Sequence, residues 1–242
     1  MDETRSPASA AEAVGVFTER HDRRKVTDWV YEEIRQAIID LRLAPGDPLR
    51  EAAIANQLGV SKTPIREALS RLEQEGLVET TSFKGAVVSG YSPRDLEDIY
   101  ELRALLEGAA VRAVADEASD ETREQLADLV TQSRASRDAG DVAALAGLLG
   151  TFDLIVYEQV TNRRIRALID NLRAHLTRIG NLTEGIPGRV EASVEEHAAI
   201  VEAIMRHDAD DAERLMRTHI ASVLTDQLAG TPGPGPEPGA EP

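Results

Sequence analysis

The spacing of apolar residues predicts that most of this chain is helical. Between residues 25 and 43 the apolar positions follow one another at helical steps, so they share one face. That face consists of Val26, Val30, Ile34, Ala37, Ile38 and Leu41. The segment 44–48, Ala-Pro-Gly-Asp-Pro, has the composition of a turn and is expected to end this helix.

Two shorter helices and a hairpin are expected next. Residues 49–58 and 61–75 are each predicted to be helical, and the second helix is followed by Gly76, a residue type favoured just after a helix. Between residues 77 and 91 two short apolar runs flank a Lys84-Gly85 turn, which is typical of a β-hairpin. Three short helices followed by a hairpin are the outline of a winged helix-turn-helix.

From Ser92 to residue 229 the pattern remains helical. Six amphipathic segments are expected over residues 93–117, 120–138, 141–160, 162–183, 189–206 and 208–228. Ser92-Pro93 and Asp208 are suited to begin helices. On the first of these helices one face is predicted to carry Ile99, Leu102, Leu106, Ala109 and Ala113. Helices of this kind form an all-α bundle.

The two ends of the chain show no such period. Residues 1–22 are expected to be a flexible arm, and residues 230–242 are rich in Pro and Gly and are expected to be a disordered tail. The predicted organisation is therefore mostly α: an arm, a winged helix-turn-helix over 23–91, a helical bundle over 92–229, and the tail.

Charge is distributed unevenly along the chain. The 242 residues are 42% hydrophobic, 29% charged and only 3% aromatic, the profile of an ordinary soluble protein. The net charge of −16 argues at first against a nucleic-acid partner. However, residues 21–92 carry 10 basic and 11 acidic residues, whereas residues 93–242 carry 15 and 28. The N-terminal module is therefore near neutral, and the acidity belongs to the helical bundle.

Several classes of protein are excluded by what the sequence lacks. It has no cysteine, which rules out disulfides and thiol catalysis and fits a reducing cytoplasm. The expected location is therefore cytoplasmic, and nucleoid-associated for a chain that binds DNA. No apolar run approaches the roughly 20 residues of a membrane helix, so no membrane partner is expected. Helical-bundle di-metal enzymes use Glu-x-x-His pairs, and none of the histidines from His175 onward has a Glu three residues before it. There is also no Gly-rich phosphate loop and no Gly-x-Ser-x-Gly, so no enzymatic activity is expected.

The helix over 61–75 has the features of a recognition helix. Its inward face carries Ile65, Leu69 and Leu72, and its other face carries Lys62, Arg66, Ser70 and Glu73. Ser61 or Thr63 is suited to cap its N-terminus. A recognition helix inserts such an end into the major groove, where arginine contacts guanine through two hydrogen bonds. The spacing alone leaves a second interpretation open, in which Lys62 and Arg66 only form a solvated face.

The segment GVSKTPIREALSRLEQEGLV, residues 59–78, resembles the DNA-binding signature of the GntR family of bacterial transcription regulators. The preceding segment VYEEIRQAIIDLRLAPGDPL resembles that family's first helix and its L-x-P-G-x-x-L turn. The resemblance covers residues 26–90. It implies a winged helix-turn-helix that binds double-stranded operator DNA as a homodimer.

Carried over position by position, the resemblance implies contacts from the recognition helix and from the wing tip. The candidate DNA-binding residues are Arg50, Ser61, Lys62, Thr63, Arg66, Lys84 and Gly85. The sequence departs from the family at two places. Lys62 stands where arginine is commonest, which leaves two-point guanine contact there open. Ala52 stands where many relatives have a DNA-contacting arginine, and Arg50 is the candidate to compensate.

The second half resembles the FadR subgroup. YSPRDLEDIYELRALLEGAAVRAVA, residues 91–115, is similar to the opening of that subgroup's FCD effector domain. EEHAAIVEAIMRHDADDAERLMRTHI, residues 195–220, is similar to its last two helices. Members of this subgroup bind small carboxylates, sometimes fatty acyl groups, inside the bundle, and many bind a divalent metal there. The resemblance therefore implies a small organic-acid effector.

In metal-binding relatives the ligands are an Asp and a His four residues apart on one helix and two later His. His197 and His219 match the last two. The segment LLGTFDLIVYEQVTN places Leu149 at the aspartate position and Asp153 at the first histidine position. Asp153, His197 and His219 remain as candidate ligands of Zn²⁺, Ni²⁺ or Mn²⁺. The alternative is a polar pocket in which Asp153 hydrogen-bonds a histidine.

The resemblance also suggests residues that contact the effector. Arg103 matches an arginine that faces the effector cavity in relatives, and a guanidinium suits a carboxylate. The alternative is a surface arginine paired with Glu107 one turn later. Arg173 and Asn181, on the segment 162–183, are further candidates.

These observations predict a sequence-specific DNA-binding regulator, a repressor whose operator affinity is controlled by a small carboxylate bound in the helical domain. Two alternatives remain open at this point. One is a DNA-binding dimer that responds to no effector, and the other is a metal-dependent helical-bundle enzyme.

Overall fold

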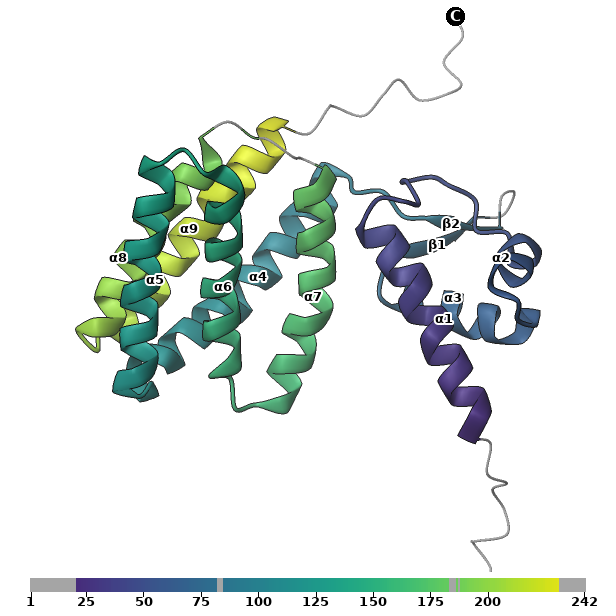
Figure 1. Ribbon diagram of the computed structural model, residues 1–242, viewed down its shortest axis with the longest axis horizontal. Helices are drawn as coiled ribbons and strands as arrows, with labels where there is room; N and C mark the ends of the chain where they lie inside the picture. The colour runs from purple at the N-terminus through teal and green to yellow at the C-terminus, as the bar shows by residue number, and fades with distance from the viewer. Residues whose placement is uncertain (1–20, 82–84, 183–185, 187, 231–242) are drawn as a thin grey trace, which may run out of the picture. The chain divides into compact units, whose positions relative to one another are not determined.

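The computed structural model describes residues 21–81, 85–182, 186 and 188–230 (Figure 1). The chain divides into two compact units. The first combines the residues up to Ile38 with Leu43–Ser89, and the second combines Ile39–Arg42 with the chain from Gly90 onward. The predicted flexible arm and disordered tail lie, apart from residues 21 and 22 and residue 230, outside the described residues.

The first unit is a winged helix-turn-helix, as predicted. Its elements are α1 (His21–Ile39), α2 (Glu51–Leu58), α3 (Lys62–Gln74), β1 (Val78–Thr81) and β2 (Gly85–Val88). The two strands pair antiparallel, with Val78 opposite Val88. The turn between α2 and α3 begins at Gly59, whose φ of 68° is a left-handed conformation that glycine adopts without strain.

The core of the first unit is formed by α1, α3 and the wing. Val30 and Ile38 of α1 are fully buried, and Leu72 of α3 packs with them. The predicted apolar face of α1 is wrong at both ends. Val26 is 37% exposed, and Leu41 lies beyond the helix with a φ of 57°, so the helix ends at Ile39 instead of Leu43.

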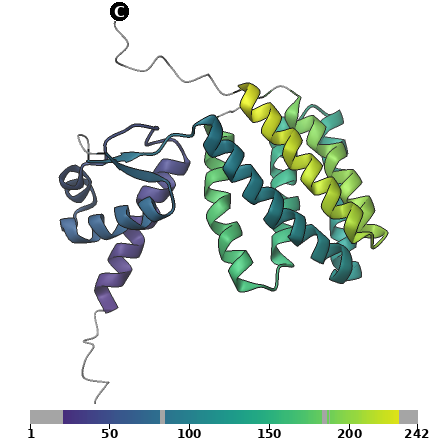
Figure 2. The ribbon, with the colours of Figure 1, turned by 180° about the vertical axis from the view of Figure 1, so that it is seen from behind.

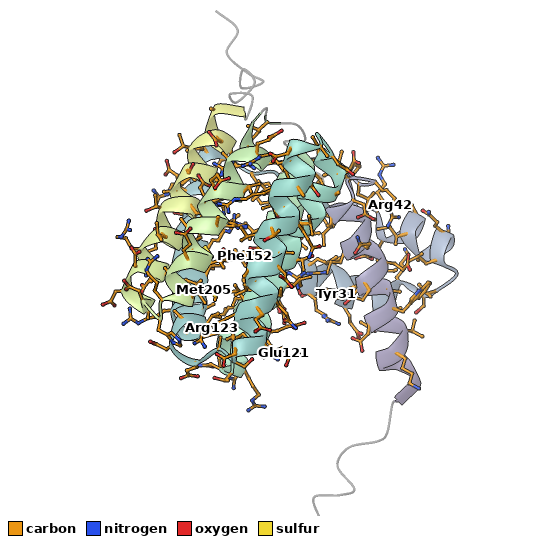
Figure 3. The ribbon with its side chains drawn as sticks, turned by 60° about the vertical axis from the view of Figure 1, so that its left-hand side comes forward. Tyr31, Arg42, Glu121, Arg123, Phe152 and Met205 are labelled. Carbon is orange, nitrogen blue, oxygen red and sulfur yellow. The ribbon has the colours of Figure 1, made fainter. Side chains whose placement is uncertain are left out.

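The second unit is the predicted six-helix bundle. Its helices are α4 (Pro93–Glu117), α5 (Asp120–Asp138), α6 (Val142–Glu158), α7 (Arg163–Leu182), α8 (Arg189–Met205) and α9 (Ala209–Gly230). Helix α4 packs along α9, α8 packs between α9 and α5, and α6 packs on α5 (Figure 2). Phe152 lies inside the bundle, whereas Met205 is on its surface (Figure 3). In the described part of the chain no helix combines the length and the apolar character that a membrane span requires.

Helix α4 begins at Pro93, directly after Ser92, where the sequence predicted a helix start. The hydroxyl of Ser92 accepts a hydrogen bond from the backbone N–H of Asp95, and the Asp95 carboxylate accepts one from the N–H of Ser92. Pro93 follows at the first helical position, where its missing N–H costs nothing. This capping box confirms the helix start predicted at Ser92-Pro93.

The predicted inner face of α4 is correct at Leu106, which is buried, and at Ile99, which packs against the core, but wrong at Leu102 and Ala109. Leu102 is 39% exposed and Ala109 also faces solvent, whereas Arg103 and Glu107 are buried. The face that packs into the bundle carries Leu96, Tyr100, Arg103, Leu106, Glu107, Ala110, Val111 and Val114. The apolar pattern misplaced this face because two charged residues occupy inward positions, where a hydrophobic pattern expects apolar ones.

Candidate DNA-binding and ligand-binding sites

Helix α3 presents a polar face at its N-terminal end. Ile65 and Leu72 are fully buried, and Leu69 nearly so. Lys62, Thr63, Arg66, Ser70 and Glu73 are exposed, which confirms the predicted division of faces. Ser61 occupies the N-cap position with an extended backbone, but its side chain makes no capping hydrogen bond. Its hydroxyl therefore stands among the polar groups at this helix end.

Arg66 is held by a carboxylate from α2. Its Nε donates to both oxygens of Glu51, at 2.9 and 2.8 Å, and this hydrogen bonding raises the pKa of Arg66. The contact uses Nε and leaves the two terminal Nη groups for another partner. Those are the groups with which an arginine contacts guanine. Glu51 was missed in the sequence because it lies 15 residues away across a turn and belongs to no periodic pattern.

The remaining candidates lie beside α2 and in the wing. Arg50 is the N-cap residue of α2 and is exposed, directly before Glu51. Gly85 begins β2 with a φ of 72°, a conformation that favours glycine. Lys84 lies outside the described residues.

Inside the second unit, two charged residues of α4 form a buried ion pair. Arg103 is 8% and Glu107 1% exposed, and Nε of Arg103 lies 2.8 Å from Oε1 of Glu107. Burial alone lowers the pKa of Arg103, but the charges of Glu107 and Asp153 raise it above its ordinary value. The pair expected from the spacing is therefore present, but in the interior and not on the surface.

Three further residues surround this pair. The hydroxyl of Tyr157, on α6, donates to Oε1 of Glu107 at 2.5 Å. Asp153 lies one turn earlier on α6, where burial and the charge of Glu107 raise its pKa to about 7 against the opposing charges of Arg103 and Arg173. Cζ of Arg173, on α7, lies 6.0 Å from the centre of the Tyr157 ring. We call these five residues the charged cluster.

His197 of α8 and His219 of α9 meet beside this cluster. Their Nε2 atoms are 3.4 Å apart, and the His197 ring stacks on Phe152 with centroids 4.1 Å apart. Burial lowers the pKa of each imidazole, and the charge of Arg103 adds to the effect. Both shifts favour the neutral form of the rings.

A carboxylate fixes the protonation pattern of the two histidines. Nδ1 of His219 lies 2.7 Å from Glu196, which Arg189 also contacts. Although burial opposes it, hydrogen bonds from His219 and Arg189 lower the pKa of Glu196 to about 2, so it is ionised. Nδ1 of His219 therefore carries the proton, and its Nε2 accepts from Nε2 of His197. This leaves Nδ1 of His197 as an acceptor, and it has no partner among the described residues.

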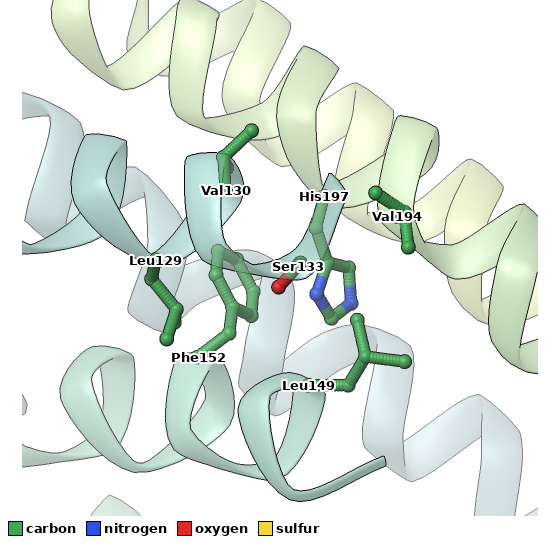
Figure 4. A pocket seen from close by; sticks show the side chains of 7 residues that line it. All are labelled: Leu129, Val130, Ser133, Leu149, Phe152, Val194 and His197. Carbon is green, nitrogen blue, oxygen red and sulfur yellow. The ribbon is translucent and has the colours of Figure 1, made fainter. Parts of the chain in front are cut away.

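Beside His197 lies a cavity of about 10 Å³, which is room for about one water molecule (Figure 4). It is lined by Leu129, Val130, Ser133, Leu149, Phe152, Val194 and His197. The Ser133 hydroxyl and the His197 ring face it together (Figure 4). Leu149, at the aspartate position of the resemblance, thus contributes an apolar wall.

The candidate metal ligands are only partly brought together. Two ligands of a tetrahedral ion, each about 2.0–2.1 Å from it, lie about 3.4 Å apart, which is the separation of the His197 and His219 nitrogens. Asp153 is instead influenced by the charges of the cluster, which shift its pKa. Among the described residues no group of three His, Asp or Glu side chains is arranged to hold a metal. The residues therefore fit two ligands of such a site.

The three predicted effector-binding residues do not all lie in one place. Arg103 and Arg173 belong to the charged cluster. Asn181, near the end of α7, is engaged elsewhere, because its amide donates to the backbone carbonyl of Ile39 at 2.8 Å. Tyr157 could not be predicted as a member of the cluster, since an aromatic residue on an apolar helix gives no signal distinct from core packing.

Two family models match this chain. The FCD domain matches residues 98–222, and the model for bacterial regulatory proteins of the gntR family matches residues 27–88. The chain belongs to the GntR family. As a GntR-family member with an FCD domain, it is a DNA-binding transcription regulator and not an enzyme.

Individual relatives agree with this assignment. The GntR chain is 32% identical, over 81% of its length and 83% of the relative, to an HTH-type transcriptional regulator in an unstable DNA locus of Streptomyces ambofaciens. It is 30% identical, over 83% of its length and 86% of the relative, to a probable D-xylose utilization operon transcriptional repressor of Paenarthrobacter nicotinovorans. A putative GntR regulator from Rhodococcus sp. RHA1 shares the fold, with a TM-score of 0.65 at 20% identity over 85% of this chain and 99% of that one.

Proposed function

We propose that this GntR-family chain is a repressor that binds its operator as a homodimer and is released by a small carboxylate bound in the second unit. The observation that carries the proposal is the exposed N-terminal end of α3, where Arg66 is held by Glu51. The repressor assignment is supported by the name of the relative from Paenarthrobacter nicotinovorans.

The DNA-binding step uses the polar end of α3. Lys62, Thr63 and Arg66 enter the major groove, while α2 lies over the sugar–phosphate backbone. The two Nη groups of Arg66 pair with one guanine, and Lys62 contacts a base or a phosphate. The wing tip at Lys84-Gly85 reaches toward the minor groove.

The dimer forms through the second unit. Helix α4 leaves Leu102 and Leu105 exposed, at 39% and 50%, three residues apart on one face. Exposed apolar side chains on one helical face fit a second copy of the same surface. A twofold dimer places the two α3 helices on half-sites about one helical turn of DNA apart, so the operator is an inverted repeat.

The effector carboxylate binds Arg173. Arg103 is already neutralised by Glu107, whereas Arg173 is exposed and none of the described carboxylates forms an ion pair with it. A guanidinium that forms no ion pair is suited to a carboxylate through two hydrogen bonds. We expect the dimer to adopt two arrangements that differ in their affinity for the operator. The effector binds one of them more tightly, and this difference in binding free energy sets how far the operator affinity changes.

A metal-dependent form of this proposal is favoured by one observation, the 3.4 Å separation of Nε2 of His197 from Nε2 of His219. In this form the two histidines hold a Zn²⁺, Ni²⁺ or Mn²⁺ ion, and Glu196 orients His219 from behind. The ion would supply a positive charge for the effector carboxylate.

The proposal is tested with an operator selected from random DNA by the full-length protein. Fluorescence anisotropy of the labelled operator is measured for the wild type, Arg173→Ala and Arg94→Ala, an exposed arginine of α4 outside the cluster. Small carboxylates should release the operator from the wild type and from Arg94→Ala. Arg173→Ala should bind the operator equally well but resist release. An operator complex that no carboxylate weakens in any of the three proteins would contradict effector control.

A further inference from the structure

We infer that two copies of this chain pair through antiparallel α4 helices, with Leu105 of each copy at the twofold axis. The inference rests on the proposed function, in which the chain is a homodimer joined through the second unit. It adds the direction and the register in which the two helices meet.

One face of α4 is uncovered and carries apolar residues at the spacing of a coiled coil. Leu102, Leu105 and Ala109 are all exposed. They follow one another at steps of three and four residues, which places them in a single seam. In Figure 2, α4 runs across the near face of the helical bundle beside α9. A seam of this kind is covered when a second helix packs along it.

Charged residues lie at the two ends of this seam. Asp98 precedes Leu105 by seven residues and Arg112 follows it by seven, so each lies about 10.5 Å from Leu105 along the helix axis. Both side chains are exposed. The seam is therefore acidic at one end, apolar in the middle and basic at the other end.

This charge pattern is complementary to its own reverse. In an antiparallel pair centred on Leu105, Asp98 of each copy lies opposite Arg112 of the other, and Leu102 lies opposite Ala109. The pair thus gains two contacts between opposite charges, one at each end. A parallel pair would place aspartate beside aspartate and arginine beside arginine, which repel each other. The ends of the seam therefore favour the antiparallel arrangement and fix its register.

Arg112 keeps a donor for this contact. It binds Asp210 and Glu213 of α9, and both of these hydrogen bonds use Nη1. Asp98 binds Arg94 through Oδ1. The second terminal nitrogen of Arg112 and the second oxygen of Asp98 form no ion pair among the described residues, so they remain for the other copy.

The chain contains no cysteine, so engineered cysteines report directly which α4 residues meet. A disulfide requires two Cα atoms within about 7 Å. Leu105→Cys should therefore link two full-length chains under mild oxidation, because Leu105 lies opposite itself. Leu102→Cys alone should not link, since its two copies are about 9 Å apart along the helices. The double variant Leu102→Cys/Ala109→Cys should link, and Ala135→Cys, at an exposed position of α5, is the control that should not.

Charge reversal tests the ends of the seam without altering its leucines. Asp98→Arg and Arg112→Asp should each raise the dissociation constant of the dimer at least about tenfold, because each places like charges opposite one another at two positions. The variant with both substitutions restores opposite charges and should regain most of the affinity. Sedimentation equilibrium measures these constants, and thermal unfolding shows that each variant is folded. Losses that add up in the double variant would overturn the pairing of Asp98 with Arg112.

The remaining outcomes separate the inference from the function on which it rests. Linkage through Leu102→Cys alone would show parallel helices and overturn the antiparallel pairing. A wild-type dimer in which none of the α4 variants links would overturn α4 as the contact and leave the homodimer intact. A wild-type chain that sediments as a monomer at every concentration, with and without its selected operator, would contradict both the inference and the proposed homodimer.

Discussion

Arg66 of α3 donates a bifurcated hydrogen bond from Nε to both carboxylate oxygens of Glu51, which lies on α2 across the turn. Nε of Arg66 lies 2.9 Å from Oε1 and 2.8 Å from Oε2 of Glu51. The arginine is thereby anchored through its inner nitrogen, and its outer nitrogens remain available. An exposed ion pair of this kind contributes little to stability, so its significance is in positioning.

We therefore expect Glu51→Gln to change which bases are preferred more than how tightly DNA is bound. Losing the anchor should weaken the preference for guanine at the position read by Arg66, while removal of one negative charge should raise affinity for unrelated DNA. Arg66→Ala should cost about 1–3 kcal/mol for each contact it makes. Binding to a panel of single-base operator variants measures both effects. A uniform change at every position in Glu51→Gln would show that Glu51 does not position Arg66.

Lys62 is expected to contribute through charge. If its ammonium contacts a phosphate, Lys62→Ala should weaken binding about equally on all sequences and reduce the slope of log affinity against log salt by about one. Lys25→Ala, an exposed lysine of α1, is the matched control. A selective loss at one base pair, with an unchanged salt slope, would instead assign Lys62 to base contact.

The buried pair of Arg103 and Glu107 should behave as a unit in unfolding experiments. Arg103→Met leaves Glu107 uncompensated in the interior and should lower the free energy of unfolding by about 3–5 kcal/mol. Adding Glu107→Gln removes that stranded charge, so the double variant should be more stable than the sum of the single variants predicts. Urea unfolding followed by circular dichroism measures the cycle. Additive losses would mean that the two charges are not coupled.

Asp153 gives a prediction about pH. Burial and Glu107 raise its pKa from 3.8 to about 7, so between these values the folded chain holds a proton that the unfolded chain has lost. This contribution to the free energy of unfolding therefore falls as the pH rises from about 4 to about 7 and is constant above that range. The Asp153→Asn variant lacks this pH-dependent contribution, because an amide does not titrate in this range. The measurement is made on protein stripped of metal with EDTA. The free energy of unfolding of the variant minus that of the wild type should increase from about pH 4 to about pH 7 and then level off. A difference that decreases with rising pH would contradict the assigned pKa shift.

The metal content of the purified protein tests the metal-dependent form. After soaking with Zn²⁺, Ni²⁺ and Mn²⁺ and removal of unbound ions, mass spectrometry should find about one ion per chain in the wild type and none in His219→Ala. Asp153→Ala should retain the ion, because among the described residues Asp153 does not join the two histidines in a group of three that could hold a metal. No ion in the wild type would exclude this form, and loss of the ion in Asp153→Ala would make Asp153 the third ligand.

Much of the architecture could be predicted from the sequence because burial in most helices follows an apolar period. On α3, Ile65, Leu69 and Leu72 lie inside as their spacing indicates. The helix ends could also be predicted from local residues. A capping box begins α4 at Ser92, and Gly76 follows α3 in a left-handed conformation, both at the predicted positions.

The features that escaped prediction depend on polar contacts between helices. The inner face of α4 was misplaced because Arg103 and Glu107 bury their charges against each other and against Tyr157, a contact with no periodic signature. The Glu51–Arg66 pair likewise joins two helices across a turn. Such contacts depend on how helices cross, which local spacing does not determine.

The most direct test of the account is the selection of bound sequences from a random DNA pool by the full-length wild type, with Arg66→Ala run in parallel. The account predicts that the wild type enriches an inverted repeat with a guanine at the same position of each half-site, and that Arg66→Ala loses this guanine preference. Enrichment of no sequence by the wild type, or of the same guanine by Arg66→Ala, would contradict it.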